Sequence, residues 1–343
     1  MLDSSRESLQ LTLQMSASYA SLIGRRENRR SLKYRRLGRT ELLVSEIALG
    51  TVELGMEYGI PADGVSAVPS AKDAGQILNK ALDLGINYID TARAYGSSEA
   101  VIGQTLKGRR SEFILASKVQ CQANPASRNE PLRDAITSSV QESLAALQTD
   151  VIDVMQIHSA PVDVIQSGEV VGILQDLQAA GCIRFIGVTV YGEEAAIEAT
   201  RVGTFDCIQL AYNILDRTPE LRVFPAAQAG DIGIIARSVL LKGALSYRYR
   251  YLPETLDDLK SAVERAAAAA RNGSMSLPEL AFRFVLGQPL VSSALVGTAS
   301  VEELESAVSF SARGTLPEDV LAEIERIRVD RPDQLNPANW AIA

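Results

Sequence analysis

From residue 45 onward, short apolar runs alternate with amphipathic stretches of about ten to fifteen residues. This alternation is typical of repeated strand–helix units that build a parallel sheet. The apolar runs predict eight strands, over residues 45–50, 86–90, 112–118, 151–158, 183–190, 205–212, 232–238 and 291–297. We therefore expect a closed (β/α)8 barrel, a TIM barrel, because a doubly wound sheet rarely reaches eight evenly spaced units.

The stretches between these runs predict the helices of the barrel. They begin near Ala71, Ser97, Pro131, Val170, Glu193, Thr218, Asp257 and Val301. Gly85 is expected to end the first of them as a C-cap glycine. Two extra helices are predicted over 276–287 and 316–329.

The N-terminal part of the chain is expected to lie outside the repeated units. Residues 33–44 predict a β-hairpin that turns at Gly38 and Arg39. Residues 1–30 are rich in serine and contain acids as well as two arginine pairs, which speaks against a targeting peptide. We expect a flexible extension over 1–30 and a single barrel domain over 31–343.

Composition limits the partners that such a barrel can have. The chain has 343 residues, 46% of them hydrophobic, and 34 basic against 42 acidic residues give a net charge of -8. This balance argues against nucleic acid and against an anionic membrane, so a small-molecule partner fits better. Three cysteines without CxxC spacing indicate no disulfide framework and no structural zinc site, which favours a reducing, cytoplasmic location.

Four titratable residues follow successive strands of the predicted barrel. Asp90 ends the second strand, Tyr95 lies in the loop after it, Lys118 ends the third strand, and His158, the only histidine, ends the fourth. Each alone has a more ordinary explanation, such as a helix cap, a surface contact or a structural histidine. Because barrel active sites form at the carboxyl ends of the strands, we expect all four to meet at one face.

These residue types suit one kind of chemistry. A phenol titrates near about pH 10, and a neighbouring ammonium favours its ionised form. Lys118 is predicted to supply that ammonium beside Tyr95, with Asp90 holding the lysine in place. His158 would donate a hydrogen bond to a carbonyl oxygen. The set predicts proton transfer to or from a carbonyl or alcohol oxygen, without a nucleophile elbow, a metal cluster or a second catalytic carboxylate.

The segments that carry these residues resemble the aldo-keto reductase family. The sequence DTARAYGSSEAVIG at 90–103 is similar to the family's DTAxxYG segment, and ILASKV at 114–119 and DVMQIH at 153–158 match its lysine and histidine strands. The stretches at 37–51 and 181–189 are also typical, so that the resemblance runs from about residue 37 to residue 310. It implies a (β/α)8 barrel and nicotinamide-dependent carbonyl reduction or alcohol oxidation. Tyr95 would be the general acid/base, tuned by Lys118 and Asp90, and His158 would orient the carbonyl.

The resemblance also implies where a nicotinamide ring would bind. The family holds the carboxamide with a Ser/Thr–Asn pair and a glutamine, which correspond here to Thr189, Val190 and Gln209. Val190 cannot form the hydrogen bonds of an asparagine. Arg237 stands where many members stack an aromatic ring, and a guanidinium plane can stack as well. Ser238, beside it, is also expected to contact the cofactor.

The segment 295–310 resembles the part of the family that binds the adenosine end of the cofactor. Members that prefer NADP(H) place an arginine or lysine there, but no basic residue occurs between Val285 and Ala312. Glu303 begins the helix instead, together with Glu302 and Glu305, and carboxylates favour a free ribose hydroxyl. We therefore expect NAD(H) rather than NADP(H). The groups expected to bind the pyrophosphate or ribose at this helix N-terminus belong to Gly297, Thr298 and Ser300.

Three further segments could shape a substrate pocket. The run SYRYRYLPETL at 246–256 could line a sugar or polyol pocket or simply form an exposed cover. The loop 56–70 is long enough to contribute, and Trp340 could fold over the mouth of the barrel.

Two other functions compete with a reductase or dehydrogenase. A regulatory barrel would bind the nucleotide and turn over slowly, as the potassium-channel β subunits of the same family do. An isomerase or aldolase would use Lys118 as a Schiff-base lysine, but Asp90 and Tyr95 argue against this.

Overall fold

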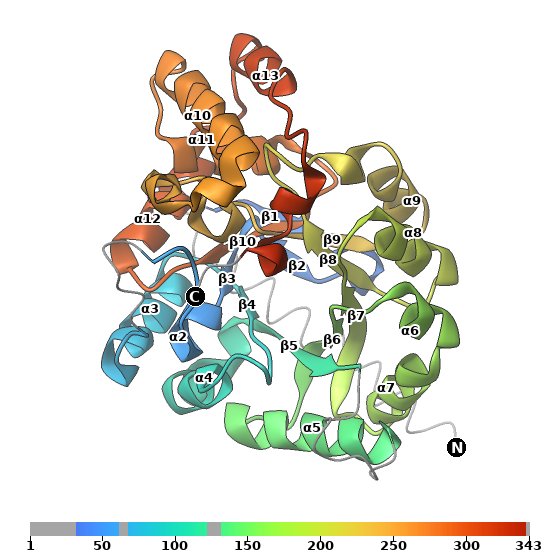
Figure 1. Ribbon diagram of the computed structural model, residues 1–343. Coiled ribbons are helices and arrows are strands. Elements are labelled where there is room, and N and C mark those ends of the chain that lie inside the picture. The colour runs from blue at the N-terminus through green and yellow to red at the C-terminus, as the bar shows by residue number, and fades with distance from the viewer. Residues whose placement is uncertain (1–31, 62–67, 122–131, 341–343) are drawn as a thin grey trace.

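The computed structural model describes residues 32–61, 68–121 and 132–340. Eight parallel strands close into a barrel in the order β10, β3, β4, β5, β6, β7, β8, β9, which confirms the predicted fold (Figure 1). Each strand overlaps one predicted run. Their bounds are β3 Ile47–Gly50, β4 Tyr88–Asp90, β5 Ile114–Gln120, β6 Ile152–His158, β7 Ile183–Thr189, β8 Cys207–Ala211, β9 Gly233–Arg237 and β10 Ser293–Gly297.

Helices surround the barrel on its outside (Figure 1). They are α2 Val52–Gly55, α3 Ala71–Asp83, α4 Ser98–Leu106, α5 Leu132–Leu147, α6 Val162–Ser167, α7 Glu169–Ala179, α8 Glu193–Val202, α9 Val223–Ala229, α10 Asp257–Asn272, α11 Leu277–Gly287, α12 Val301–Ser311 and α13 Glu318–Glu325. Among the described residues, no helix combines the length and the apolar character that a membrane crossing requires.

The local sequence explains the regular joins between helices and strands. In α3, the Ser70 hydroxyl accepts a hydrogen bond from the backbone N–H of Asp73 and so caps the helix. One face of the helix is apolar and packs on the barrel, through Ala74, Ile77, Leu78, Ala81 and Leu82. Gly85 follows with φ 94°, a left-handed conformation that a C-cap glycine adopts without a steric penalty.

Two predicted helices differ from the structure for identifiable reasons. Thr218 begins a short 3-10 turn, η3 (Thr218–Glu220), and α9 begins later, at Val223. Glu220 accepts a hydrogen bond from the Tyr212 hydroxyl at 2.5 Å, which fixes the turn to the loop after β8. The closing helix α13 ends at Glu325 because the Arg217 side chain donates hydrogen bonds to carbonyl oxygens at its C-terminus, that of Ile324 in the last turn and that of Ile327 just beyond it.

A hairpin closes the floor of the barrel at the amino ends of the strands. It consists of β1 (Tyr34–Arg36), the turn η1 (Gly38–Thr40) and β2 (Leu43–Ser45), and it turns at Gly38 and Arg39 as predicted. Leu37 is fully buried at its tip. It belongs to an interior cluster with Val44, Ala48, Tyr88, Ile114, Ala116, Val154, Cys207 and Ile235.

Arg35 fastens this hairpin to a distant part of the chain. Its guanidinium donates hydrogen bonds to the carbonyl oxygens of Leu286 at 2.6 Å, Val291 at 2.7 Å and Gln288 at 3.1 Å. These three carbonyls follow or end α11, just before β10. One side chain therefore joins the first described strand to the end of α11 and to the loop that leads into the last strand of the barrel.

The tight turn at Gly38 allows the packing of the hairpin against the amino ends of the barrel strands to be tested. Gly38 has φ 50°, and a Cβ there would collide with the backbone of Gly233 and Asp231. Gly38→Ala should therefore lower the free energy of unfolding by about 3 kcal/mol or more. Gly203, which ends α8 with φ 70° and has open space around it, is the matched control. Gly203→Ala should cost only about 1 kcal/mol, the conformational penalty alone. Equal losses in chemical denaturation would contradict the close packing at Gly38.

Candidate active site

A buried ion pair lies inside the barrel beneath its carboxyl-end mouth. Lys118 in β5 is 1% exposed, and its Nζ lies 2.5 Å from Oδ2 of Asp90, the last residue of β4. The same ammonium donates to the Thr91 carbonyl oxygen at 2.8 Å. Lys118 was expected to end its strand, but β5 continues to Gln120, which pairs with His158 of β6. The lysine therefore lies deeper in the barrel than the strand prediction implied.

Two amides complete the environment of Asp90. Its Oδ1 accepts hydrogen bonds from Nε2 of Gln209 at 2.7 Å and from Nε2 of Gln156 at 3.0 Å. Gln156 was not predicted as a site residue. The sequence could have predicted it, because Gln156 lies two residues before His158 and residues two apart in a strand face the same side. Gln209, expected at the cofactor, uses its amide nitrogen to hold Asp90.

Tyr95 and His158 lie above this pair, facing the pocket. Nζ of Lys118 is 4.6 Å from the centre of the Tyr95 ring. The rings of Tyr95 and His158 meet edge to face, with centroids 5.8 Å apart and an interplanar angle of 83°. The four residues that the sequence singled out thus lie together at the carboxyl ends of neighbouring strands.

The net effect of burial and neighbouring charges is to raise the pKa of Lys118 and to lower the pKa of His158. Burial lowers the pKa of Lys118, but the attraction of Asp90 and Tyr95 outweighs it, so the pKa rises above its ordinary value and the ammonium stays charged. Burial is also the main cause that lowers the pKa of His158 to about 4, and Lys118 and Arg237 lower it further. The imidazole is therefore neutral near pH 7 and has one N–H to donate.

A pocket of about 780 Å³ runs from this group to the helix α12. Asp90, Tyr95 and His158 line one end, while Lys118 lies behind them. Seven of the eight residues expected at a cofactor also line the pocket, namely Thr189, Gln209, Arg237, Ser238, Gly297, Ser300 and Glu303. The eighth, Thr298, is buried and instead donates its hydroxyl to Oε2 of Glu303 at 2.6 Å.

The pocket wall next to His158 differs from the Ser/Thr–Asn pair with which the family holds the nicotinamide carboxamide. The hydroxyl oxygen of Thr189 accepts the backbone N–H of Ser159 at 2.6 Å. Val190 is buried and does not line the pocket, so its position offers no polar group there. Arg237 donates to the Val190 carbonyl oxygen at 2.9 Å, and its guanidinium lies over the ring of Tyr191, 4.1 Å from the ring centre.

The loop after β9 brings two cations into the pocket, of which Lys242 was not predicted and Arg248 belongs to the run 246–256 that was considered as a pocket lining. Lys242 lies in the turn η4 (Leu241–Gly243), and Arg248 lies in η5 (Tyr247–Tyr251), within the predicted tyrosine- and arginine-rich run. Arg248 also donates to the Ile60 carbonyl oxygen at 2.8 Å. The backbone of this loop is left-handed at four positions, Ser238, Leu241, Lys242 and Gly243. The loop 56–70 contributes Met56, Tyr58 and Gly59, and its residues 62–67 lie outside the described part.

Trp340 does not cover the mouth, contrary to expectation. Its side chain is buried, and its indole N–H donates to the Gln334 carbonyl oxygen at 2.8 Å. Gln334 in turn accepts the backbone N–H of Leu259 at the start of α10. The C-terminal segment therefore packs against the outer helices, because the indole finds both an apolar site and an acceptor there.

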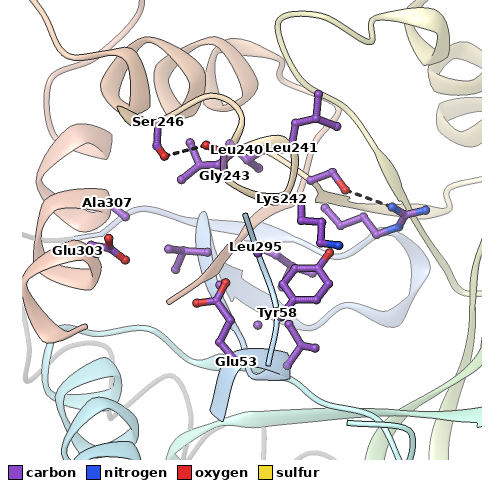
Figure 2. A pocket seen from close by; sticks show the side chains of 18 of the residues that line it. Glu53, Tyr58, Leu240, Leu241, Lys242, Gly243, Ser246, Leu295, Glu303 and Ala307 are labelled. Atoms are coloured by element: carbon purple, nitrogen blue, oxygen red, sulfur yellow. Dashed lines mark hydrogen bonds between the residues drawn. The ribbon is translucent and has the colours of Figure 1, made fainter. Parts of the chain in front are cut away.

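The far end of the pocket combines carboxylates with an apolar surface. Ser300 caps α12, since its hydroxyl accepts the backbone N–H of Glu303. The Glu303 side chain lines the pocket beside Ala307, as Figure 2 shows. Phe282 and Phe310 line the same end. The donor set therefore fits a dinucleotide, with amide and hydroxyl groups at one end, cations and hydroxyls in the middle, and an apolar site for a base at the other end.

The chain is similar to members of one protein family along most of its length. A model of the aldo/keto reductase family matches residues 46–329. L-galactose dehydrogenase of Arabidopsis thaliana is 30% identical over 314 residues, covering 86% of this chain and 94% of that protein. D-threo-aldose 1-dehydrogenase of a Pseudomonas species is 28% identical, covering 76% and 89%. The holo form of an aldo-keto reductase from Bacillus halodurans has a TM-score of 0.71 at 28% identity, covering 87% of this chain and 96% of that chain.

The single histidine makes the protonation state of the site directly measurable. Because the pKa of His158 is lowered to about 4, its imidazole should stay neutral from pH 8 down to about pH 5. The proton NMR signal of the ring, recorded on tag-free protein, should not shift over this range. The same protein unfolded in denaturant is the control and should titrate near about pH 6.5. A folded midpoint near 6.5 would contradict the buried imidazole.

Proposed function

The chain belongs to the aldo/keto reductase family of oxidoreductases, and we propose that it transfers hydride between NAD(H) and an aldehyde, a ketone or a sugar hydroxyl. The observation that carries this proposal is the arrangement of Tyr95 over the Lys118–Asp90 pair, next to a neutral His158, at one end of the pocket. Tyr95 combines exposure to the pocket with a transferable proton and with the Lys118 ammonium under its ring, which favours the phenolate.

Each residue has a separate task in this proposal. When bound, the nicotinamide supplies or accepts the hydride. Tyr95 donates a proton to the substrate oxygen during reduction and takes it back during oxidation. Lys118 stabilises the phenolate that remains, and Asp90 keeps the ammonium in position. His158 donates its single N–H to the same substrate oxygen and thereby orients the reacting carbon.

The contacts of Thr189 and Gln209 support their role at the carboxamide. Because Asp90 occupies the Gln209 amide nitrogen, the amide oxygen remains as an acceptor for an NH2 group. Because Thr189 already accepts the N–H of Ser159, its own hydroxyl hydrogen remains to be donated. The pair thus offers one acceptor and one donor, which match a primary amide without help from Val190.

Charge at α12 supports NAD(H) over NADP(H). Glu302 and Glu303 both line this end of the pocket, and a 2′-phosphate there would meet carboxylates rather than cations. A free ribose diol can instead donate to a carboxylate. Lys242 and Arg248 line the same pocket but come from the loop after β9 rather than from this helix, so we assign them to the diphosphate.

The mouth of the pocket supports a sugar as substrate. Tyr58, Tyr191 and Tyr247 are exposed large side chains that line it, and Arg237 stacks on one of them. Aromatic faces together with a few polar groups bind sugar rings well. Two of the related proteins are named as dehydrogenases of L-galactose and of D-threo-aldoses. We therefore propose oxidation of an aldose as the first reaction to assay.

Replacing Tyr95 tests the chemical step. Tyr95→Phe should lower kcat by about 10²-fold to 10⁴-fold, because the proton donor is lost, while the Kd of the cofactor changes little. Tyr191→Phe, which removes a hydroxyl at the same mouth but keeps the stacked ring, should retain near wild-type kcat. Steady-state assays with aldoses and carbonyls, combined with cofactor titrations, give both quantities. Undiminished turnover by Tyr95→Phe would refute the assigned role.

Reversing one charge on α12 tests the cofactor preference. Glu303→Arg should strengthen NADPH binding by about tenfold or more relative to NADH, because a cation replaces a carboxylate in the pocket. Glu305→Arg makes the same charge change on the same helix, but Glu305 pairs with Lys80 outside the pocket. This control should leave the ratio of the two Kd values unchanged. An equal effect of both variants would mean that Glu303 does not face the 2′ position.

A further inference from the structure

Glu53 occupies the middle of the pocket and has no role in the chemistry described above. It is the second residue of α2, which follows β3, and it lines the pocket. A methyl group on Gly297 would lie 3.4 Å from Oε1 of Glu53, so the carboxyl group lies along the end of β10. Figure 2 shows Glu53 and Glu303 entering the same cavity from α2 and α12.

The surroundings of Glu53 are unfavourable for a negative charge. Burial is the main cause that raises its pKa to about 7, and Glu303 raises it further, while Arg248 acts in the opposite direction. Tyr58 on the adjoining loop is a further titratable group near Glu53, and Lys242 on η4 lies over its ring, 5.6 Å from the ring centre. Within the described part of the chain, no hydrogen bond fixes the carboxyl group.

The position of Glu53 corresponds to the middle of a bound dinucleotide. The catalytic tyrosine lies at one end of the pocket, and the apolar surface around Phe310 lies at the other. A dinucleotide carries its diphosphate halfway between its two rings. The left-handed loop at 238–243 and the cations Lys242 and Arg248 line the same pocket, and Arg248 lies near enough to Glu53 to act on its pKa. The diphosphate must therefore pass close to Glu53.

We propose that Glu53 takes up one proton from solvent when the dinucleotide diphosphate binds, so that this residue makes cofactor affinity depend on pH. The inference rests on the proposed nicotinamide dependence. Two phosphate charges beside an ionised carboxylate repel it, and protonation of the carboxyl removes the repulsion. Below about pH 6 the proton is already present, and affinity is constant. Above about pH 7 binding must draw a proton from solvent, and affinity falls as pH rises.

The test is the Kd of NADH, followed by NADH fluorescence from pH 5.5 to 9. For the wild type, Kd should be flat at low pH and rise by up to about tenfold per pH unit above pH 7, the slope for one proton. Glu53→Gln should abolish most of this rise and bind NADH about tenfold or more tightly than the wild type at pH 8.5. Glu57→Gln, which removes an exposed carboxylate outside the pocket, should behave like the wild type.

A second variant, and the thermal stability of the protein without cofactor, test the role of Glu53 independently. Glu303→Gln should move the midpoint of the Kd rise to lower pH, because Glu303 raises the pKa of Glu53. In the free protein, a raised pKa contributes stability that is lost as pH increases through about 7. Glu53→Gln should therefore melt at a higher temperature than the wild type at pH 8.5, and the difference should shrink as pH falls towards 4.5.

The possible failures are distinguishable. NADH binding with the same pH dependence in Glu53→Gln and in the wild type would overturn the role of Glu53 and leave the proposed function intact. No binding of NADH or NADPH at any pH would overturn the proposed function and, with it, the linkage to Glu53.

Discussion

The ion pair between Lys118 and Asp90 is the interaction on which both the barrel interior and the site depend. Burying two charges costs several kcal/mol unless hydrogen bonds satisfy the remaining atoms. Here the Thr91 carbonyl oxygen satisfies the ammonium, and Gln156 and Gln209 satisfy the carboxylate. These groups come from β4, β5, β6 and β8, so one polar network spans half the barrel. The network holds the ammonium beneath Tyr95 and at the same time fixes the register of the strands that carry it.

The walls of the pocket carry opposite charges. Lys242 and Arg248 enter from the loop after β9, whereas Glu53 and Glu303 enter from α2 and α12. A ligand with a charged centre is therefore attracted by one wall and repelled by the other. The net attraction for such a ligand depends on pH more than it would in a purely basic cleft. The reason is that the pKa of Glu53 lies close to neutral pH.

Sequence periodicity was sufficient to predict all eight strands, the floor hairpin and the meeting of Asp90, Tyr95, Lys118 and His158. These features follow from local patterns and from one rule, that the carboxyl ends of barrel strands converge. The remaining features depend on long-range packing. Arg248 reaches the pocket because its loop docks on Ile60, and the segment that carries Trp340 packs on α10 because Gln334 accepts the backbone N–H of Leu259. No local pattern encodes either contact.

The floor hairpin has a consequence for the order in which the chain can fold. Arg35 binds carbonyl groups that lie 251 to 256 residues further along the sequence, and Leu37 packs against β9 and other strands. During synthesis, these partners emerge from the ribosome long after the hairpin itself. The first described strand can therefore dock only when nearly all of the barrel has been made. Closure of the floor is then among the last events of folding, and partly made chains keep the amino ends of their strands exposed.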